Sequence, residues 1–311
     1  MLDNTWPLEI PATVIGCVAS RCLDGPRRGR VVALSDSTFY ILADDQMLCV
    51  GTQSLSRGPL NVVTTAPSTT NWTASGVQHH AAALVSASEI RLPNRFVFSM
   101  SQRVIWSPGT VVGDIDPVGL RRGLDALSMA AAYSAPDDGI GRFLVRDFTP
   151  ACTDFVCRAA QAPVTEARSW LSDAFAIADM RTSSHPAWVG KIAGLGPGLT
   201  PSGDDFLGGI MIALHTLGRP DICADLWRVT SQQVKTDGNA VSFAHLAAAS
   251  EGVGGEGMHA AIAAIVGGNN REVLDAIPAI ARIGHTSGWD ALAGVAITCE
   301  SWLATRPAIS P

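Results

Sequence analysis

The stretch Gly194-Leu195-Gly196-Pro197-Gly198-Leu199-Thr200-Pro201-Ser202-Gly203-Asp204-Asp205 leads directly into an apolar run over residues 206–214. Glycines permit positive φ and a close approach of a ligand to the backbone, while prolines restrict the freedom of the loop. Ser202 has the residue type of a helix N-cap, and Asp205 stands three residues later, where a capping-box acid stands. The pattern therefore predicts a stiff loop that enters a buried helix.

This loop has two interpretations. In the functional one, free N–H groups of the loop and the helix start bind an anion such as phosphate or carboxylate, and Asp204 or Asp205 holds a metal or orients a polar substrate. In the structural one, the acids only complement the helix dipole of a rigid turn. Two adjacent acids exceed what capping requires, which favours function. The candidate binding residues of the loop are Gly196, Gly198, Thr200, Ser202 and Gly203. The spacing matches neither common nucleotide-binding pattern, G-x-x-x-x-G-K-[ST] or G-x-G-x-x-G.

A second loop of similar design occurs near the C-terminus, at Gly284-His285-Thr286-Ser287-Gly288, with Asp290 shortly after it. Ser287 is predicted to cap a helix in which Asp290 is the third-residue acid. His285 is a candidate general acid or base, or a hydrogen-bond donor to a carbonyl or phosphate. Alternatively, it ties the loop to a backbone carbonyl. Thr286, Ser287 and Asp290 are candidate substrate-binding residues, and we expect the two junctions to face each other across one pocket.

Both motifs resemble those of a bacterial family long known only as a domain of unknown function. Its hallmarks are G-x-G-x-G-L-T-P-S-G-D-D and G-H-[ST]-S-G-x-D-x-L-x-G, which match residues 194–205 and 284–294. One member is a subunit of a multi-subunit oxamate carbamoyltransferase of allantoin (purine) catabolism, which converts oxalurate and phosphate to oxamate and carbamoyl phosphate. The resemblance implies a carbamoyltransferase (transferase) subunit that acts with other subunits. It also adds Thr236 and Ser242 as weaker site candidates.

Three hypotheses follow for the function. The chain is a carbamoyltransferase-type enzyme subunit acting on small ureide-derived acids, or a non-catalytic subunit that binds a metabolite or serves as a scaffold, or a metal-assisted hydrolase that uses Asp204 and Asp205. The third is disfavoured because these acids lack further ligands at a recognisable metal-site spacing. No G-x-S-x-G elbow or activated cysteine is evident. We therefore predict no metal and no cofactor, with catalysis, if any, by Asp204, Asp205 and His285 through positioning and electrostatic stabilisation.

Composition narrows the class of protein. Of the 311 residues, 47% are hydrophobic and 16% are charged, which suits a large folded core. The net charge of −6 and the absence of a large basic cluster disfavour nucleic acid as a partner. No apolar run reaches the roughly 20 residues of a membrane helix, and no signal peptide is recognised. Seven scattered cysteines without a C-x-x-C pattern predict no disulfide framework or zinc knuckle. We expect a cytoplasmic protein that binds a small anionic metabolite.

The order of the elements predicts an α+β protein. Short strands with tight turns between residues 12 and 106 indicate a mostly antiparallel sheet or a small barrel. A helical pattern spans 117–134, and helices follow from about residue 149, including 151–160 and 163–180 as two separate helices. We place a soft domain boundary near 150, with a β-rich domain at 1–150 and a helical domain at 151–311 that carries the glycine-rich loop.

Overall fold

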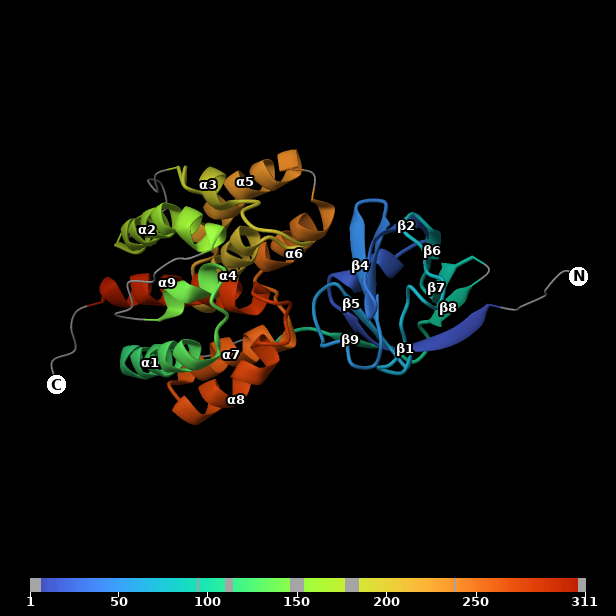
Figure 1. Ribbon diagram of the computed structural model, residues 1–311, viewed down its shortest axis with the longest axis horizontal. Helices are drawn as coiled ribbons and strands as arrows, with labels where there is room; N and C mark the ends of the chain where they lie inside the picture. The colour runs from blue at the N-terminus through green and yellow to red at the C-terminus, as the bar shows by residue number, and fades with distance from the viewer. Residues whose placement is uncertain are drawn as a thin grey trace, which may run out of the picture. The chain divides into compact units, whose positions relative to one another are not determined.

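The computed structural model describes residues 7–93, 95–109, 114–145, 154–176, 185–237 and 239–306. The chain forms two compact units, Met1–Pro108 and Gly109–Pro311 (Figure 1). Strands make up the first unit and helices make up the second. The predicted α+β class, with a β-rich part followed by a helical part, is confirmed.

The first unit contains a nine-stranded sheet in the described residues. Its strands are β1 (Leu8–Gly16), β2 (Arg27–Leu34), β3 (Thr38–Ala43), β4 (Gln46–Gly51), β5 (Asn61–Thr64), β6 (Ala82–Val85), β7 (Glu89–Leu92), β8 (Phe96–Ser99) and β9 (Val104–Trp106). The sequence signal for β6 is weak, because its two alanines have low intrinsic strand propensity. Its alternating burial shows that packing in the sheet decides its conformation.

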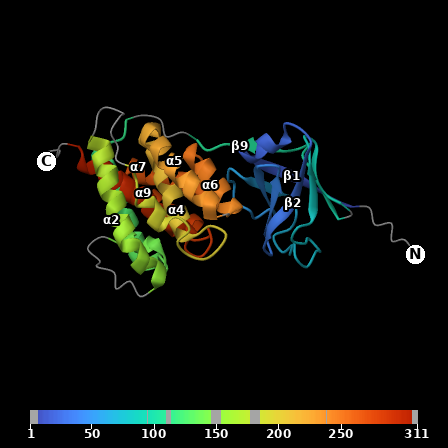
Figure 2. The ribbon, with the colours of Figure 1, turned by 90° about the horizontal axis from the view of Figure 1, so that it is seen from above.

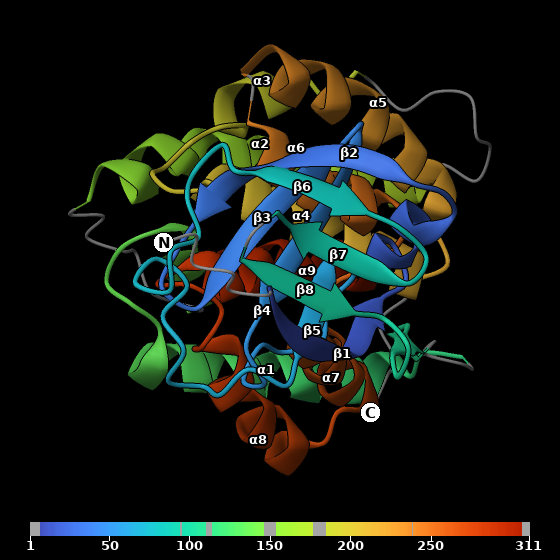
Figure 3. The same ribbon diagram turned by 90° about the vertical axis from the view of Figure 1, so that its right-hand side faces the viewer.

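The sheet closes on itself. Its strand order is β5-β4-β3-β2-β6-β7-β8-β1-β9, and β1 also pairs with β5, where Ile15 lies opposite Val62. Figure 3 shows β2, β6, β7 and β8 side by side. The pairings of β1 with β8 and β9 and of β4 with β5 are parallel, and the others are antiparallel. A register shift between Ala12 and Val14 bends β1, as closure of a small barrel requires.

Aromatic side chains fill the centre of the first unit. The ring of Trp72 meets those of Phe39 and Phe98 at centroid distances of 5.4 and 5.8 Å, with edge-to-face geometry. The indole Nε1 of Trp72 donates a hydrogen bond to the carbonyl of Ser37 at 2.9 Å. Trp72 belongs to the segment between β5 and β6, which therefore supplies a central core residue.

The second unit is built from helices. They are α1 (Pro117–Ser134), α2 (Phe155–Ala176), α3 (Val189–Ile192), α4 (Ser202–Thr216), α5 (Pro220–Asp237), α6 (Ala240–Ser250), α7 (Glu256–Gly267), α8 (Asn270–Ile280) and α9 (Ser287–Ala304), with a short 3-10 helix, η2 (Ile140–Leu144). The prediction of separate helices at 151–160 and 163–180 was wrong, because α2 continues through Pro163. Residues 151–153 and 177–180 of that prediction lie outside the described residues. Buried side chains on both sides of the proline, such as Cys157 and Leu171, explain how packing offsets one lost backbone hydrogen bond.

The unit boundary lies earlier in the chain than the expected position near residue 150. Helix α1 belongs to the helical unit, where Leu120, Leu124 and Leu127 join the same buried core as α4 and α9. At the contact between α1 and α7, a Cβ on Gly123 would lie 2.0 Å from the carbonyl oxygen of Ile265. The change in sequence character near 150 therefore does not mark the point where the packing changes.

Helices α4 and α9 form the centre of the second unit (Figures 1 and 2). Helix α4 is buried on all sides for most of its length, which explains its nearly continuous apolar sequence. The two helices cross where each has a glycine. A Cβ on Gly209 would lie 1.9 Å from the carbonyl oxygen of Ala291, and a Cβ on Gly294 would lie 2.1 Å from that of Phe206. These glycines allow the close approach that brings the starts of both helices together.

Two further findings concern membrane-spanning helices and the state of the cysteines. Within the described parts of the chain, no helix combines the length and apolarity needed to cross a membrane. Five cysteines there are free thiols, whereas Cys157 is disulfide-bonded.

Candidate functional site

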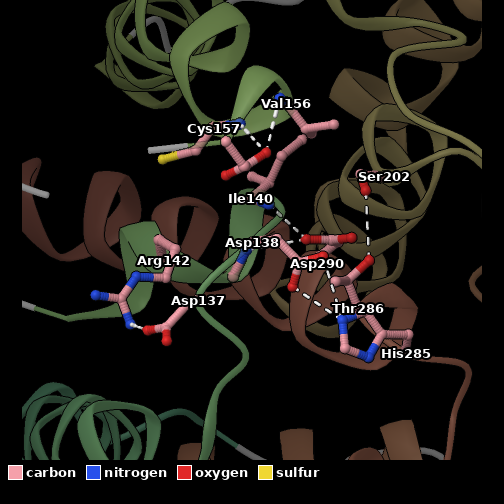
Figure 4. Close-up of polar contacts among 12 residues, drawn as sticks. Asp137, Asp138, Ile140, Arg142, Val156, Cys157, Ser202, His285, Thr286 and Asp290 are labelled. Carbon is pink, nitrogen blue, oxygen red and sulfur yellow. Dashed lines mark hydrogen bonds and ion pairs between the residues drawn. The ribbon is translucent and has the colours of Figure 1, made fainter. Parts of the chain in front are cut away.

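The two loop-to-helix junctions lie against each other. The Thr200 hydroxyl is 3.3 Å from the Ser287 hydroxyl, and the Ser202 hydroxyl is 3.4 Å from that of Thr286. Figure 4 shows the second of these contacts beside Asp290. The juxtaposition expected from the shared design of the two loops is therefore present in the structure.

The two serines do not cap their helices. Pro201 and Thr286 occupy the N-cap positions of α4 and α9, and neither helix has a side-chain cap hydrogen bond. Ser202 and Ser287 are each the first helical residue. The capping roles predicted for them were wrong, because each hydroxyl faces a hydroxyl of the opposite junction instead of its own backbone.

The glycines of the first loop serve its backbone geometry. Gly196 and Gly198 have φ values of 108° and 102°, which side chains rarely adopt. Gly203 is required by packing, since a Cβ there would lie 1.8 Å from the carbonyl oxygen of Ile192. The loop is therefore a defined structure, held against the end of α3.

Asp204 ties this loop to its neighbours. Its Oδ1 accepts a hydrogen bond from the Gly194 N–H at 2.8 Å, and its Oδ2 accepts a short hydrogen bond from the Ser242 hydroxyl. Asn239, the N-cap of α6, also donates from Nδ2 to the carbonyl of Leu199 at 3.0 Å. Asp204 is almost fully buried, and both of its oxygens are engaged within the protein.

Asp205 lies in a different environment one residue later. Burial raises the pKa of its carboxyl well above the ordinary value, and the hydroxyls of Ser287 and Thr200 oppose that shift by hydrogen bonding. The negative charges of Asp290 and Asp204 raise the pKa further. Its Oδ2 is buried and has no hydrogen-bond partner among the described residues.

Asp290 is the equivalent carboxyl of the second junction, and it is fully buried. Its Oδ1 accepts hydrogen bonds from the backbone N–H groups of Ile140 at 2.6 Å and Gly141 at 2.9 Å, at the start of η2 (Figure 4). Burial raises its pKa, against hydrogen bonds from Thr286, Ser202 and these two N–H groups. Its Oδ2, like that of Asp205, lacks a partner in the described chain.

His285 lies at the exposed rim of the site. Its Nε2 is 3.0 and 3.2 Å from the two carboxyl oxygens of Asp138, and 76% of the His285 side chain is exposed (Figure 4). His285 therefore contacts a side-chain carboxyl, and not a backbone carbonyl as in the alternative interpretation. Asp138 is not among the site residues predicted from the sequence. The sequence feature that could have indicated it is its position between Asp137 and Gly139.

The two junctions share one sequence motif, S-G-x-D-x-L-x-G, at residues 202–209 and 287–294. The contacts between the copies are reciprocal. Thr200 and Ser202 of the first junction contact Ser287 and Thr286 of the second. Burial raises the pKa of both Asp205 and Asp290, and the Ser287 hydroxyl opposes that shift at Asp205 as the Ser202 hydroxyl does at Asp290. The final glycine of each copy packs on a carbonyl of the other. The candidate site is therefore built from two similar halves that contact each other reciprocally.

Several polar residues of the second unit outside the two junctions make contacts within the protein or are buried. Lys191 pairs with Glu166 at 2.6 Å, and the Thr236 hydroxyl donates to the carbonyl of Gln232 at 3.0 Å. Burial lowers the pKa of His245 to about 4. His259 accepts a hydrogen bond from the Gly254 N–H at 2.9 Å, and burial lowers its pKa too. Among the described residues, no group of three or more His, Cys, Asp or Glu side chains is placed to hold a metal ion.

Comparison with known families converges on the same part of the chain. Residues 192–299 match the family model of the oxamate carbamoyltransferase subunit AllH. The match covers about a third of the chain, and the similarity concerns this segment. This AllH segment runs from the last residue of α3 into α9 and contains both copies of the motif. No curated protein and no solved structure matches the chain significantly.

Proposed function

We propose that the chain is a subunit of an oxamate carbamoyltransferase-like enzyme and that its paired junctions bind a small anionic ligand. The ligand class is a ureide-derived acid, carbamoyl phosphate or phosphate. One observation carries the proposal: both motifs of the AllH segment converge at one place, and each contributes a carboxyl with a buried oxygen that lacks a protein partner among the described residues.

Two features of the site suit an anion. The N-termini of α4 and α9 lie side by side, so the positive ends of two helix dipoles act on the same place. Four hydroxyls, from Thr200, Ser202, Thr286 and Ser287, add groups that both donate and accept hydrogen bonds. Gly196 and Gly198 give the first loop a backbone whose N–H groups a ligand can approach.

The residues have distinct proposed roles. Asp205 and Asp290 orient the polar ligand from the buried side, since each keeps an oxygen without a partner in the described chain. His285, at the exposed rim with Asp138, moves a proton. We assign Asp204 to positioning the loop, because Gly194 and Ser242 engage both of its oxygens.

The reaction implied by the family resemblance fits such roles. A phosphate oxygen attacks the carbamoyl carbon of oxalurate, and the bond from that carbon to the nitrogen of the oxamate part breaks. The phosphate loses a proton and the leaving nitrogen gains one, so a proton-moving group at the site lowers the barrier. Hydroxyl and backbone donors held in place stabilise the charge that develops on oxygen.

The second candidate is a binding subunit whose partner chain performs the chemistry. It is favoured by the name of the matching family, which describes a subunit and not a whole enzyme. In this case the same junctions bind the ligand, and the catalytic groups lie on another chain.

Phosphate-dependent cleavage of oxalurate tests the proposal. The full chain is assayed alone and mixed with the other subunits of the carbamoyltransferase, and the variants Asp205→Asn and His285→Ala are compared with the surface control Asp275→Asn. A loss of activity in the two site variants, but not in the control, supports a catalytic role. If both site variants leave the activity of the mixture intact and the chain still binds the ligand, the result favours the binding subunit.

A further inference from the structure

We infer that Asp205 and Asp290 form a donor–acceptor pair that recognises the amide group of the ligand, with Asp205 as a carboxylic acid and Asp290 as a carboxylate. The inference rests on the proposed function and names the ligand chemistry of that site. The group recognised is a primary amide or ureido group, in which an amino donor and a carbonyl acceptor stand next to each other.

The first step is the equivalence of the two carboxyls. Each is the fourth residue of the repeated S-G-x-D-x-L-x-G motif. Each lies on the first turn of its helix, and the serine hydroxyl of the other copy opposes the rise in its pKa that burial causes. They therefore lie on the first turns of two helices whose starts meet, and the negative charge of Asp290 acts on Asp205.

The second step concerns the unpartnered oxygens. Oδ2 of Asp205 and Oδ2 of Asp290 are both buried without a hydrogen-bond partner in the described residues, and the Asp290 side chain is fully buried. An unsatisfied buried polar group costs about 1–3 kcal/mol, so such groups are rare without a reason. Two of them at equivalent positions of one site indicate two places for ligand atoms.

The third step separates the two carboxyls. The charge of Asp290, together with burial, raises the pKa of Asp205, so the two carboxyls do not both ionise easily and one of them keeps a proton. Asp290 accepts two backbone N–H hydrogen bonds, which stabilise its ionised form. Asp205 is supported by hydroxyls alone and also feels the charge of Asp204. The proton therefore resides on Asp205.

The other charged groups of the site are already engaged. Asp204, on the same helix as Asp205, accepts hydrogen bonds at both oxygens. Asp138, before η2, pairs with His285, and Asp137 pairs with Arg142 at 3.3 Å (Figure 4). Of the carboxyls on the two junctions and in the segment before η2, Asp205 and Asp290 are thus those with a buried oxygen that has no partner among the described residues.

A carboxylic acid beside a carboxylate complements an amide. The O–H of Asp205 donates to the amide carbonyl, and the Asp290 carboxylate accepts from the amide N–H. A dicarboxylate of similar size offers no N–H to Asp290 and places its negative charge against that carboxylate. A site built to hydrogen-bond a substrate N–H rejects the analogue that lacks it.

Calorimetric binding of oxamate and oxalate tests the pair, because the two probes differ only in the amide. The full chain is used alone and with the other carbamoyltransferase subunits. We expect oxamate to bind at least about tenfold more tightly than oxalate. Asp290→Asn places a donor opposite the amide N–H, so we expect its loss of oxamate affinity to exceed that of Asp205→Asn by about tenfold.

A second measurement does not depend on the folding of Asp290→Asn. The infrared spectrum of the ligand-free wild type at neutral pH should contain a carboxylic-acid C=O band that Asp205→Asn removes and that Asp275→Asn retains. Equal affinity for oxamate and oxalate, or absence of that band, overturns the donor–acceptor pair. If oxamate, oxalate and phosphate all fail to bind in every mixture, the proposed function itself fails, which is a distinguishable result.

Discussion

The hydroxyl of Thr200 lies 3.3 Å from the hydroxyl of Ser287, although 87 residues separate them in the sequence. Each residue belongs to the junction at which a loop enters a central helix of the second unit. The contact exists because α4 and α9 cross at glycines, which lets the starts of the helices meet. The site therefore depends on helix packing as much as on its own residues.

The helix crossing should not tolerate a methyl group. In Gly209→Ala the new Cβ would lie 1.9 Å from the carbonyl oxygen of Ala291, so the helices must move apart. We expect a loss of about 1–3 kcal/mol in the free energy of unfolding, measured with urea. Gly267→Ala is the matched control, because no atom lies within 4 Å of its Cβ at the end of α7. Equal stability of the two variants would contradict the role of the crossing.

Asp204 should matter for stability more than a surface acid does. Asp204→Asn replaces an acceptor of Gly194 and Ser242 by an amide that cannot satisfy both in the same way. We expect about 1–3 kcal/mol of lost unfolding free energy. Asp275→Asn removes an exposed ion pair with Arg271 and should cost about 0.5 kcal/mol or less. The two urea titrations are compared directly, and similar costs would show that Asp204 does not tie the loop.

Titration of Asp205 should lower the free energy of unfolding as the pH rises. Burial raises the pKa of its carboxyl in the folded state, so the folded state binds more protons than the unfolded one. This contribution to stability is fully present below the ordinary pKa of about 3.9 and is lost as the pH rises through the raised value.

Asp205→Asn removes that titration, so the difference in unfolding free energy between variant and wild type should shift in favour of the variant as the pH rises. The slope approaches about 1.4 kcal/mol for each pH unit within the window. Urea unfolding at pH values from about 4 to about 8 measures the difference. A difference that does not change with pH would show that Asp205 titrates normally.

The exposed pair of His285 and Asp138 should affect function and not stability. Their contact is 3.0 Å, but 76% of the His285 side chain is exposed, and exposed pairs contribute about 0–1 kcal/mol. His285→Ala should therefore unfold at nearly the wild-type urea concentration, while oxalurate cleavage by the mixed subunits falls at least about a hundredfold, as for a lost acid–base group.

Asp138→Asn removes the negative charge beside His285 and so separates the effect of that charge from the orientation of the His285 ring. It keeps a side chain that can contact His285, and we expect a smaller loss of activity than in His285→Ala. If both variants retain wild-type activity in the complete mixture, the rim of the site has no part in proton movement.

The amino-acid sequence by itself determined the class of fold, the limits of α1 and the two loops that carry the candidate site. These features follow from short-range rules: glycines and prolines mark the loops, and the apolar runs of α4 and α9 mark buried helices. The similarity of Gly194–Asp205 to Gly284–Asp290 also suggested their juxtaposition, because similar junctions in one chain suit one pocket.

Only the tertiary structure decided which groups complete the site. The N–H of Ile140 reaches Asp290 across 150 residues, and Asp138 reaches His285 across 147, and no local pattern encodes such contacts. Packing also decided that Ser202 and Ser287 face each other's junctions instead of capping their helices, and that both oxygens of Asp204 are engaged while one oxygen of Asp205 lacks a partner in the described chain. Adjacent residues on a helix point in different directions, so burial and partners, not residue type, separate their roles.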